Sequence, residues 1–249
     1  MITAIFFLFA VTQTPPVFDV ASVKPSTQTF VEIFPKRSGG RITWTTDLRF
    51  VINYAYGLPL NRIQGAIPSS DHTYHFEVAT NADATDAQVR EMFQTLLADR
   101  FKMKSHRETK QVDSYVLSVS KPGKLKPATP GENPPLPKWL GATPPADVEG
   151  KAMATMPESG IATITGRRVP IAKLCEVLAR VLGAPVLDNT GLAGNFYFDL
   201  RFAHGDQTDA DAPSVFSVIR DELGLKLDGG KHPVEMLIID SIEKTPVEN

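Results

Sequence analysis

The sequence has little cysteine, little net charge and no apolar run long enough to cross a membrane. Cys175 is the only cysteine among the 249 residues, which excludes a disulfide framework and a Cys-x-x-Cys metal or redox site. The formal net charge of -2 gives no overall positive field for nucleic acid or for an anionic membrane, and we expect no nucleic-acid partner. Any partner recognised by its charge must therefore bind to a local group of charged side chains.

The start of the chain has the composition of a signal peptide. An apolar run at residues 2–11 is too short to span a bilayer and precedes a segment of Thr, Gln and Pro, although no Lys or Arg comes before it. A first strand here would be followed at once by two prolines, which continue poorly into a sheet. We predict that residues 1–16 are a signal peptide, that the mature chain begins between Gln13 and Val17 without a transmembrane span, and that the protein is periplasmic or secreted.

Two stretches of the chain, residues 41–120 and 161–243, carry the same order of predicted elements. The clearest matching pair is residues 74–78 and 196–200, where apolar residues alternate and an acidic residue occupies the same outward position. The sequence therefore predicts an α+β fold of two tandem β-α-β-β-α-β-β repeats, in which each repeat is a small sheet covered by two helices.

The predicted elements follow from hydrophobic periodicity and from end signals. Thr85 and Gln88 have the spacing of a capping box, Pro170 suits a first helical turn, and Gly57, Gly183 and Gly224 follow helical patterns as glycine does at helix ends. Before the middle of the chain we expect strands at 18–25, 41–46, 73–80, 101–107 and 112–119, an extended segment at 30–34, and helices at 48–56 and after Thr85. Beyond it we expect strands at 161–165 and 195–202, helices at 170–183 and 213–224, and a final hairpin of residues 225–227 and 234–242.

A proline-rich segment with few apolar side chains, residues 121–151, separates the repeats and is typical of an extended linker. The predicted domain organisation is a signal peptide at 1–16, N-terminal strands and the first repeat at 17–120, the linker at 121–151, and the second repeat at 152–249.

A stripe of cations lies on the strand predicted at residues 101–107. Alternation along a strand places Lys102, Lys104 and His106 on one face, with Arg107 and Lys110 beside them. Such a stripe is suited to contact carboxylates or phosphates, and it is equally the pattern of a solvated outer face. We predict these five residues as the candidate binding site and leave both interpretations open.

Other candidate chemistry has a simpler explanation. His72 and His75 are three apart on a predicted strand, so their side chains point to opposite faces. The aspartates of residues 206–211 lack the Gly and the final Glu of a calcium loop, and Ser159 is not in a nucleophile elbow. Cys175 lies on the apolar face of its helix and is interpreted as a buried apolar residue. No catalytic constellation is recognisable, and we expect no cofactor and no metal.

Segments spread over the chain, residues 18–25, 54–58, 97–102 and 186–194, together with the ending at 234–246, resemble the signature segments of the soil-associated bacterial protein family of unknown function. The resemblance covers nearly the whole mature chain. It implies no activity, although some relatives carry the domain beside a membrane metallopeptidase of the antibiotic-sensor type. No His-Glu-x-x-His motif occurs here.

Each predicted repeat is also similar, in element order and in the Gly224-Leu225 pair after the second helix, to the short N-terminal domain of secretins and TonB-dependent receptors. Those domains are periplasmic protein-contact modules, and a likeness of fold supports function only by association. We expect an exported, non-catalytic binding module that contacts an envelope protein, a peptide or a cell-wall polymer. The alternatives are a hydrolase-type enzyme with a site between the repeats and an extracytoplasmic sensor domain.

Overall fold

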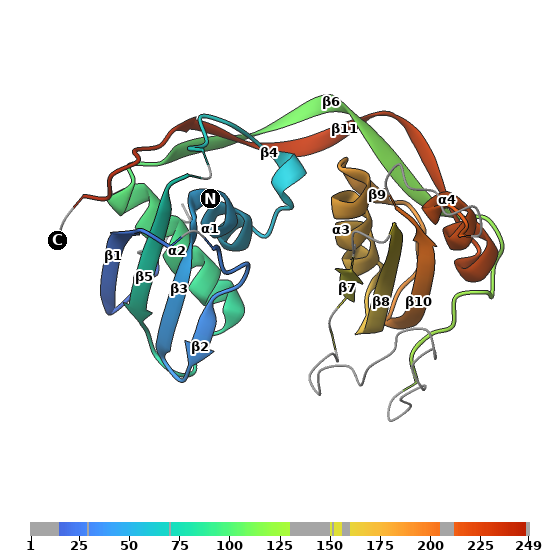
Figure 1. Cartoon of the computed structure of the whole chain (residues 1–249), viewed down its shortest axis with the longest axis horizontal. Helices are drawn as coiled ribbons and strands as arrows, with labels where there is room; N and C mark the ends of the chain where they lie inside the picture. Colours follow the sequence, from blue (N-terminus) through green and yellow to red (C-terminus); the bar gives the residue numbers. More distant parts are fainter. Residues whose placement is uncertain are drawn as a thin grey trace, which may run out of the picture. The chain divides into compact units, whose positions relative to one another are not determined.

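The protein is an α+β fold, as the sequence predicts, and its chain divides into two compact units (Figure 1). A computed structural model describes residues 15–28, 30–69, 71–129, 150, 152–155, 160–204 and 212–247. Among them, unit 1 comprises the residues up to Arg107 together with those from Leu237 onward, and unit 2 comprises the residues from Glu108 to Met236.

Unit 1 is built on an antiparallel sheet of strand order β1-β5-β3-β2. Its strands are β1 (Val20–Ser26), β2 (Lys36–Ser38), β3 (Arg41–Asp47) and β5 (Thr73–Ala79). Trp44 of β3 lies opposite Phe76 of β5, and both side chains are fully buried. The predicted alternation of β5 is confirmed, because Tyr74, Phe76 and Val78 are buried whereas His75 and Glu77 are exposed.

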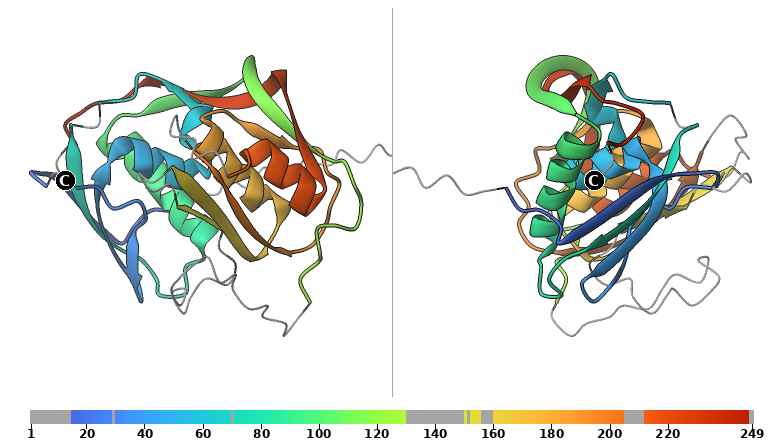
Figure 2. Two further views of the ribbon diagram at one scale, coloured as in Figure 1. Left: turned by 45° about the vertical axis from the view of Figure 1, so that its right-hand side comes forward. Right: turned by 90° about the vertical axis from the view of Figure 1, so that its left-hand side faces the viewer.

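Two helices cover the buried face of this sheet (Figure 2). Helix α1 (Leu48–Tyr56) begins at Asp47, whose carboxylate accepts the backbone N–H groups of Arg49 and Phe50, and it ends at Gly57 with φ of 63°. Helix α2 (Asp86–Arg100) opens with the predicted capping box of Thr85 and Gln88. A short turn, η1 (Leu60–Arg62), and strand β4 (Ile63–Gly65) connect α1 to β5.

Aromatic rings fill the unit 1 core. The ring of Phe93 on α2 makes edge contacts with Phe18, Trp44, Tyr54 and Phe76, with centroids 5.0 to 6.3 Å apart. Such edge-to-face pairs add to the stabilisation that burial alone provides. Because these rings come from the segment before β1, from two strands and from both helices, one cluster fixes both helices on the same sheet face.

Unit 2 contains a three-stranded antiparallel sheet of order β10-β8-β7. Its elements are β7 (Ala152–Thr155), β8 (Ile161–Val169), α3 (Ile171–Leu182), β9 (Val186–Asp188), β10 (Phe196–Ala203), α4 (Val215–Val218) and the π-helical turn η3 (Ile219–Leu223). Helix α3 buries Leu174 and Leu178, and η3 buries Ile219, in the core that also holds Ile164 and Phe198. Pro170 is the residue before α3, one position earlier than predicted, and Gly183 ends the helix as expected.

A bulge distinguishes β8 from β3. The register between β10 and β8 shifts between Phe196 and Phe198, and Arg168 in the bulge has φ of 51°. The ring of Phe198 lies over Gly166, where a Cβ atom would approach it to 2.2 Å. Glycine is therefore required at this position, since only a hydrogen fits beneath the ring.

The last two strands differ from the prediction. The sequence predicted two strands after each second helix, but the structure has one long strand in each place, β6 (Lys104–Val119) and β11 (Leu225–Ser241). They are neighbours in a sheet of order β4-β11-β6-β9, in which β4 pairs with β11 and β9 with β6, both in parallel. The turns expected near Arg107 and at Gly229 do not form, because each strand continues beside the other.

A second difference concerns residues 30–34, which are not a strand; the short strand β2 follows them instead. Several expectations fall on residues outside the described part of the chain. These are most of the signal peptide, the linker from 130 to 149, the loop of residues 205–211 and Ser159. The superposition of the two predicted repeats stays a prediction.

Candidate functional site

The predicted cationic stripe begins in a turn, not in a strand. Helix α2 ends at Phe101, and the N–H groups of Phe101 and Met103 both donate to the carbonyl of Leu97, at 3.1 and 3.2 Å. Phe101 and Met103 are buried, while Lys102 between them is exposed. The outward position of Lys102 is thus as predicted, but its cause is the turn and not the alternation of a strand.

Lys102 has an unusual backbone conformation. Its φ is 49°, in the left-handed region that side chains other than glycine and asparagine rarely adopt. A residue with a Cβ atom is destabilised there by about 1 to 2 kcal/mol. Backbone strain of this kind is often found at functional positions. The left-handed conformation therefore makes Lys102 a candidate functional residue.

Lys104 and His106 follow on β6 and are both exposed. His106 is already engaged, because its Nδ1 atom lies 2.9 Å from one carboxylate oxygen of Asp240 on β11 and 3.1 Å from the other. A protonated His106 is therefore paired within the protein, and it is not a free contact for an external anion.

The remaining two cations also have interactions of their own. Lys110 lies 3.3 Å from the carboxylate of Glu108 on the same strand, and Arg107 takes part in a further interaction. Lys110 belongs to unit 2, whereas the other four residues belong to unit 1. Within the described residues, Lys102 and Lys104 make no ion pair, so the candidate site reduces to these two ammonium groups.

The C-terminal segment fixes the backbone around the two lysines. Glu243 donates its N–H to the carbonyl of Phe101 at 2.7 Å, and Val247 donates to the carbonyl of Arg100 at 2.8 Å. Arg100 in turn donates from Nη1 to the carbonyl of Val247 at 3.0 Å. The cations at the end of α2 also lie where the helix dipole favours positive charge. The backbone that leads into Lys102 is therefore fixed by hydrogen bonds to the C-terminal segment.

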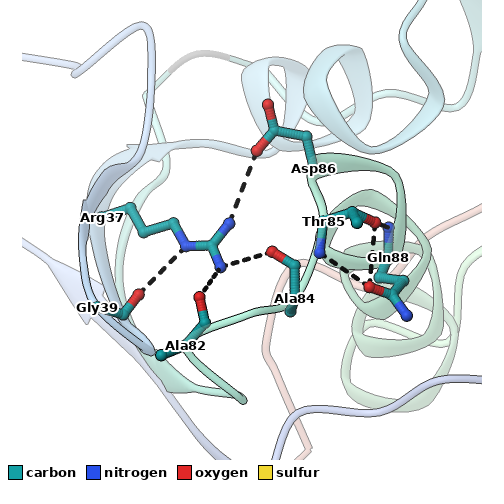
Figure 3. Close-up of polar contacts among 7 residues, drawn as sticks. All are labelled: Arg37, Gly39, Ala82, Ala84, Thr85, Asp86 and Gln88. Carbon is teal, nitrogen blue, oxygen red and sulfur yellow. Dashed lines mark hydrogen bonds and ion pairs between the residues drawn. The ribbon is translucent and has the colours of Figure 1, made fainter.

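An arginine network that the sequence analysis did not find organises the start of α2 (Figure 3). Arg37 donates to the carbonyls of Gly39, Ala82 and Ala84 at 3.2, 3.1 and 2.6 Å, and its Nη1 lies 3.7 Å from Asp86. These donors are used within the protein to join β2 to the loop before α2. The role of Arg37 is thus structural, and sequence offered no signal for it because its acceptors are backbone carbonyls.

Two hydroxyl groups contact imidazole rings, a pairing that hydrolases use. Thr45 Oγ1 lies 2.9 Å from His75 Nδ1, and Ser114 Oγ lies 3.0 Å from His232 Nδ1. A hydrolytic triad also needs a carboxylate on the second imidazole nitrogen. In the part of the chain that the structure describes, no carboxylate forms a hydrogen bond or ion pair with His75 or His232, so neither pair forms a triad.

The cysteine and the acidic residues are the other candidates for chemistry. Burial raises the pKa of Cys175 to about 12, which leaves its thiol protonated and unreactive at neutral pH. Among the described residues, no group of His, Cys, Asp and Glu side chains is arranged to hold a metal ion. His72 lies 3.9 Å from Asp71 and precedes β5, apart from His75 within that strand.

The chain matches a family of proteins of unknown function. The family model described as Protein of unknown function (DUF3738) matches residues 49–242, which is most of the chain. No curated protein and no solved structure matches the sequence. No helix in the described ranges is long and apolar enough to cross a membrane.

Proposed function

We propose that this chain, which belongs to the DUF3738 family of proteins of unknown function, is an exported, non-catalytic binding module. Its partner is an envelope protein, a peptide or a cell-wall polymer that presents carboxylate or phosphate groups. The contact is made by Lys102 and Lys104, at the junction of α2 and β6.

The observation that carries this proposal is the conformation of Lys102. A lysine in left-handed backbone destabilises the fold, and glycine would remove that strain. The side chain is exposed and makes no ion pair among the described residues, so it contributes nothing evident to stability. A role in recognising a negatively charged partner accounts for a cation at this strained position.

The sequence supports export. Two further features support a role as a binding module. The apolar run at residues 2–11 has the length of a signal-peptide core. The element order predicted from the sequence for each repeat is similar to that of the short N-terminal domain of secretins and TonB-dependent receptors, which are periplasmic contact modules, and this similarity adds support by association. Phe30, Ile33 and Phe34 are 60%, 53% and 66% exposed, and neighbouring exposed apolar residues are common at protein contacts.

The experiment is a capture assay with a charge-matched control. The mature protein is immobilised and exposed to envelope extract and to isolated cell wall, and bound material is identified by mass spectrometry. The double substitution Lys102→Glu and Lys104→Glu should abolish capture of the major ligand while the circular dichroism spectrum stays unchanged. The control carries Lys24→Glu and Lys126→Glu, two exposed lysines elsewhere on the chain, and has the same net charge.

Each outcome of the assay bears on the proposal. Capture that the control retains and the Lys102 and Lys104 variant loses supports the proposed site. Capture that both variants retain removes these lysines from the function and directs attention to the exposed apolar residues 30–34. Turnover of a captured polymer or peptide would replace the binding role with an enzymatic one.

A further inference from the structure

Lys102 stands where glycine ends other helical segments. Helices α1 and α3 and the turn η3 end at Gly57, Gly183 and Gly224, with φ of 63°, 66° and 69°. The chain leaves α2 through the same left-handed region, but with a lysine at φ of 49°. Glycine is common at such positions because it adopts this conformation without a steric penalty. Lys102 therefore depends on contacts that hold its backbone there.

The peptide groups on both sides of Lys102 are held by hydrogen bonds. The carbonyl of Phe101, which precedes it, accepts the N–H of Glu243 at 2.7 Å. The N–H of Met103, which follows it, donates to the carbonyl of Leu97 at 3.2 Å. Peptide groups are planar, so the conformation of a residue is the rotation between the two planes that flank it. The two bonds together hold that rotation at Lys102; one comes from α2 and the other from the C-terminal segment.

Glu243 is itself kept in place by the residues that follow it. The hydroxyl of Tyr74 donates to the carbonyl of Lys244. Val247 donates its N–H to the carbonyl of Arg100 at 2.8 Å, and Arg100 donates from Nη1 to the carbonyl of Val247 at 3.0 Å. Residues 243–247 are thus attached to unit 1 on both sides of the turn at the end of α2.

These residues contribute little to the core. The side chains of Glu243, Lys244, Thr245 and Val247 are exposed, so burial of apolar surface accounts for little of their attachment. Two of their backbone N–H groups donate to the residues immediately before Lys102. The main structural effect of the segment is therefore on the turn that presents Lys102.

We propose that residues 243–247 are a strap that holds Lys102 in the left-handed conformation and so sets the direction of its ammonium group for anion binding. Side-chain direction follows backbone conformation, so a relaxed turn would point the side chain elsewhere. Any event that detaches the strap then weakens binding of the anionic partner, although both lysines are still present. The effect on binding rests on the proposed function of Lys102, whereas the strain at Lys102 does not.

The test removes one donor from the strap in the full chain. Glu243→Pro deletes the N–H that bonds to Phe101. The matched control is Glu243→Gln, which removes the same charge and keeps the N–H. A third variant, Tyr74→Phe with Arg100→Met, removes the two side-chain donors that attach the strap.

Lys102→Gly is introduced into the unaltered chain and into each variant, and the urea midpoint of unfolding is measured for every pair. Lys102→Gly should raise the midpoint in the unaltered chain and in Glu243→Gln, because it relieves the strain. Most of this rise should be lost in Glu243→Pro and part of it in the third variant, which decides alone if Glu243→Pro does not fold. An equal rise in all chains, or no rise in the unaltered chain, would overturn the proposal.

Binding is measured on the same proteins with poly-L-glutamate as the probe. Glu243→Pro should bind the probe more weakly than Glu243→Gln, which carries the same net charge. Equal affinities of these two variants would overturn the link between the strap and the binding site. An unaltered protein that does not bind the probe counts against the proposed function of Lys102, and the urea midpoints then decide the strap.

Discussion

At the scale of single residues, Lys102 has a strained backbone and a positive charge, and a substitution can separate the effects of the two. Replacing Lys102 by Gly should raise the free energy of unfolding by about 1 kcal/mol, because glycine adopts left-handed backbone without a steric penalty. The same change should weaken capture of the anionic partner, since it removes one of the two lysines of the proposed site. Urea denaturation and the capture assay measure the two quantities on the same protein sample.

The neighbouring lysine provides the control for that experiment. Lys104→Gly removes an equal charge at the first residue of β6, in extended backbone, where glycine lowers stability by up to roughly 0.5 to 1 kcal/mol. Opposite signs for the two glycine variants are expected. A loss of stability in Lys102→Gly comparable to that in Lys104→Gly would show that the left-handed conformation imposes no strain.

Phe101 anchors the turn that presents these lysines. It is fully buried, and its ring lies 5.2 Å from that of Tyr74 and 6.3 Å from that of Phe76. Phe101→Ala should lower the free energy of unfolding by about 3 to 5 kcal/mol by leaving a cavity in the core. Reversal of Lys102 and Lys104 should change it by only about 0.5 kcal/mol, and thermal unfolding that ranks these variants otherwise would refute the assignment.

Residue-scale prediction from sequence succeeded where a contact is local. The capping box of Thr85 and Gln88 and the glycine at the end of α1 depend on neighbours a few residues away, so spacing alone reveals them. The Arg37 network and the pairing of His106 with Asp240 join residues far apart in the chain. No local pattern encodes such pairs, so alternation alone placed His106 in one stripe with Lys102 and Lys104, whereas in the structure it is paired with Asp240.

At the scale of elements, the segment before β2 shows how a side chain replaces strand pairing. Glu32 donates its backbone N–H to the carbonyl of Thr45 at 2.8 Å, and its carboxylate accepts the N–H of Thr45 at 2.9 Å. The indole of Trp44 donates to the carbonyl of Glu32 at 2.7 Å. The predicted extended segment is therefore fixed beside β3 by one glutamate, without forming a strand.

This arrangement predicts a dependence of stability on pH. The hydrogen bond from Lys36 and that from the Thr45 backbone lower the pKa of Glu32 below its ordinary value of 4.5. A carboxyl group with a lowered folded-state pKa stabilises the fold above its unfolded pKa, and that stabilisation is lost as pH falls through the folded value. Glu32→Gln should therefore reduce stability more near neutral pH than at about pH 3, because the stabilisation declines as the pH falls below 4.5.

Urea unfolding at the two pH values measures this difference. Glu91→Gln, at an exposed carboxylate on α2, is the matched control and should have a small effect at both. An equal loss of stability in Glu32→Gln at both pH values would show that the charge of Glu32 does not contribute.

The helices and most strands could be predicted because their periodicities are strong and their ends are marked. The long strands β6 and β11 could not, since their exposed middle sections carry polar residues and glycines that are typical of turns. What keeps those sections extended is the neighbouring strand, a tertiary contact that lies outside any sequence window. Strand β2 was not predicted because it is short and its side chains are exposed, so it has no apolar alternation.

At the scale of the whole molecule, the predicted linker at residues 121–151 should be the first site of cleavage. The first residues of this range are held by unit 2, because Leu125 is buried in its core and Ala128 donates to the carbonyl of Asn195 at 2.7 Å. The proline-rich remainder has few apolar side chains, so cleavage is expected there first. Brief treatment with a protease of broad specificity, followed by intact-mass analysis, should give fragments that end within this range. First cuts within α2 would contradict both the linker and the helix assignment.

We propose that Lys102 and Lys104, at the junction of α2 and β6, bind an anionic partner, and the salt dependence of binding is the measurement that tests this proposal. The dissociation constant of the captured ligand is measured at low and high ionic strength for the unaltered protein and for the variant with Lys102→Ala and Lys104→Ala. The unaltered protein should bind more weakly as salt rises, because contacts between exposed charges are screened. The variant should bind more weakly at low salt and should lose most of this dependence. Equal affinity and equal salt dependence for the two proteins would contradict the claim.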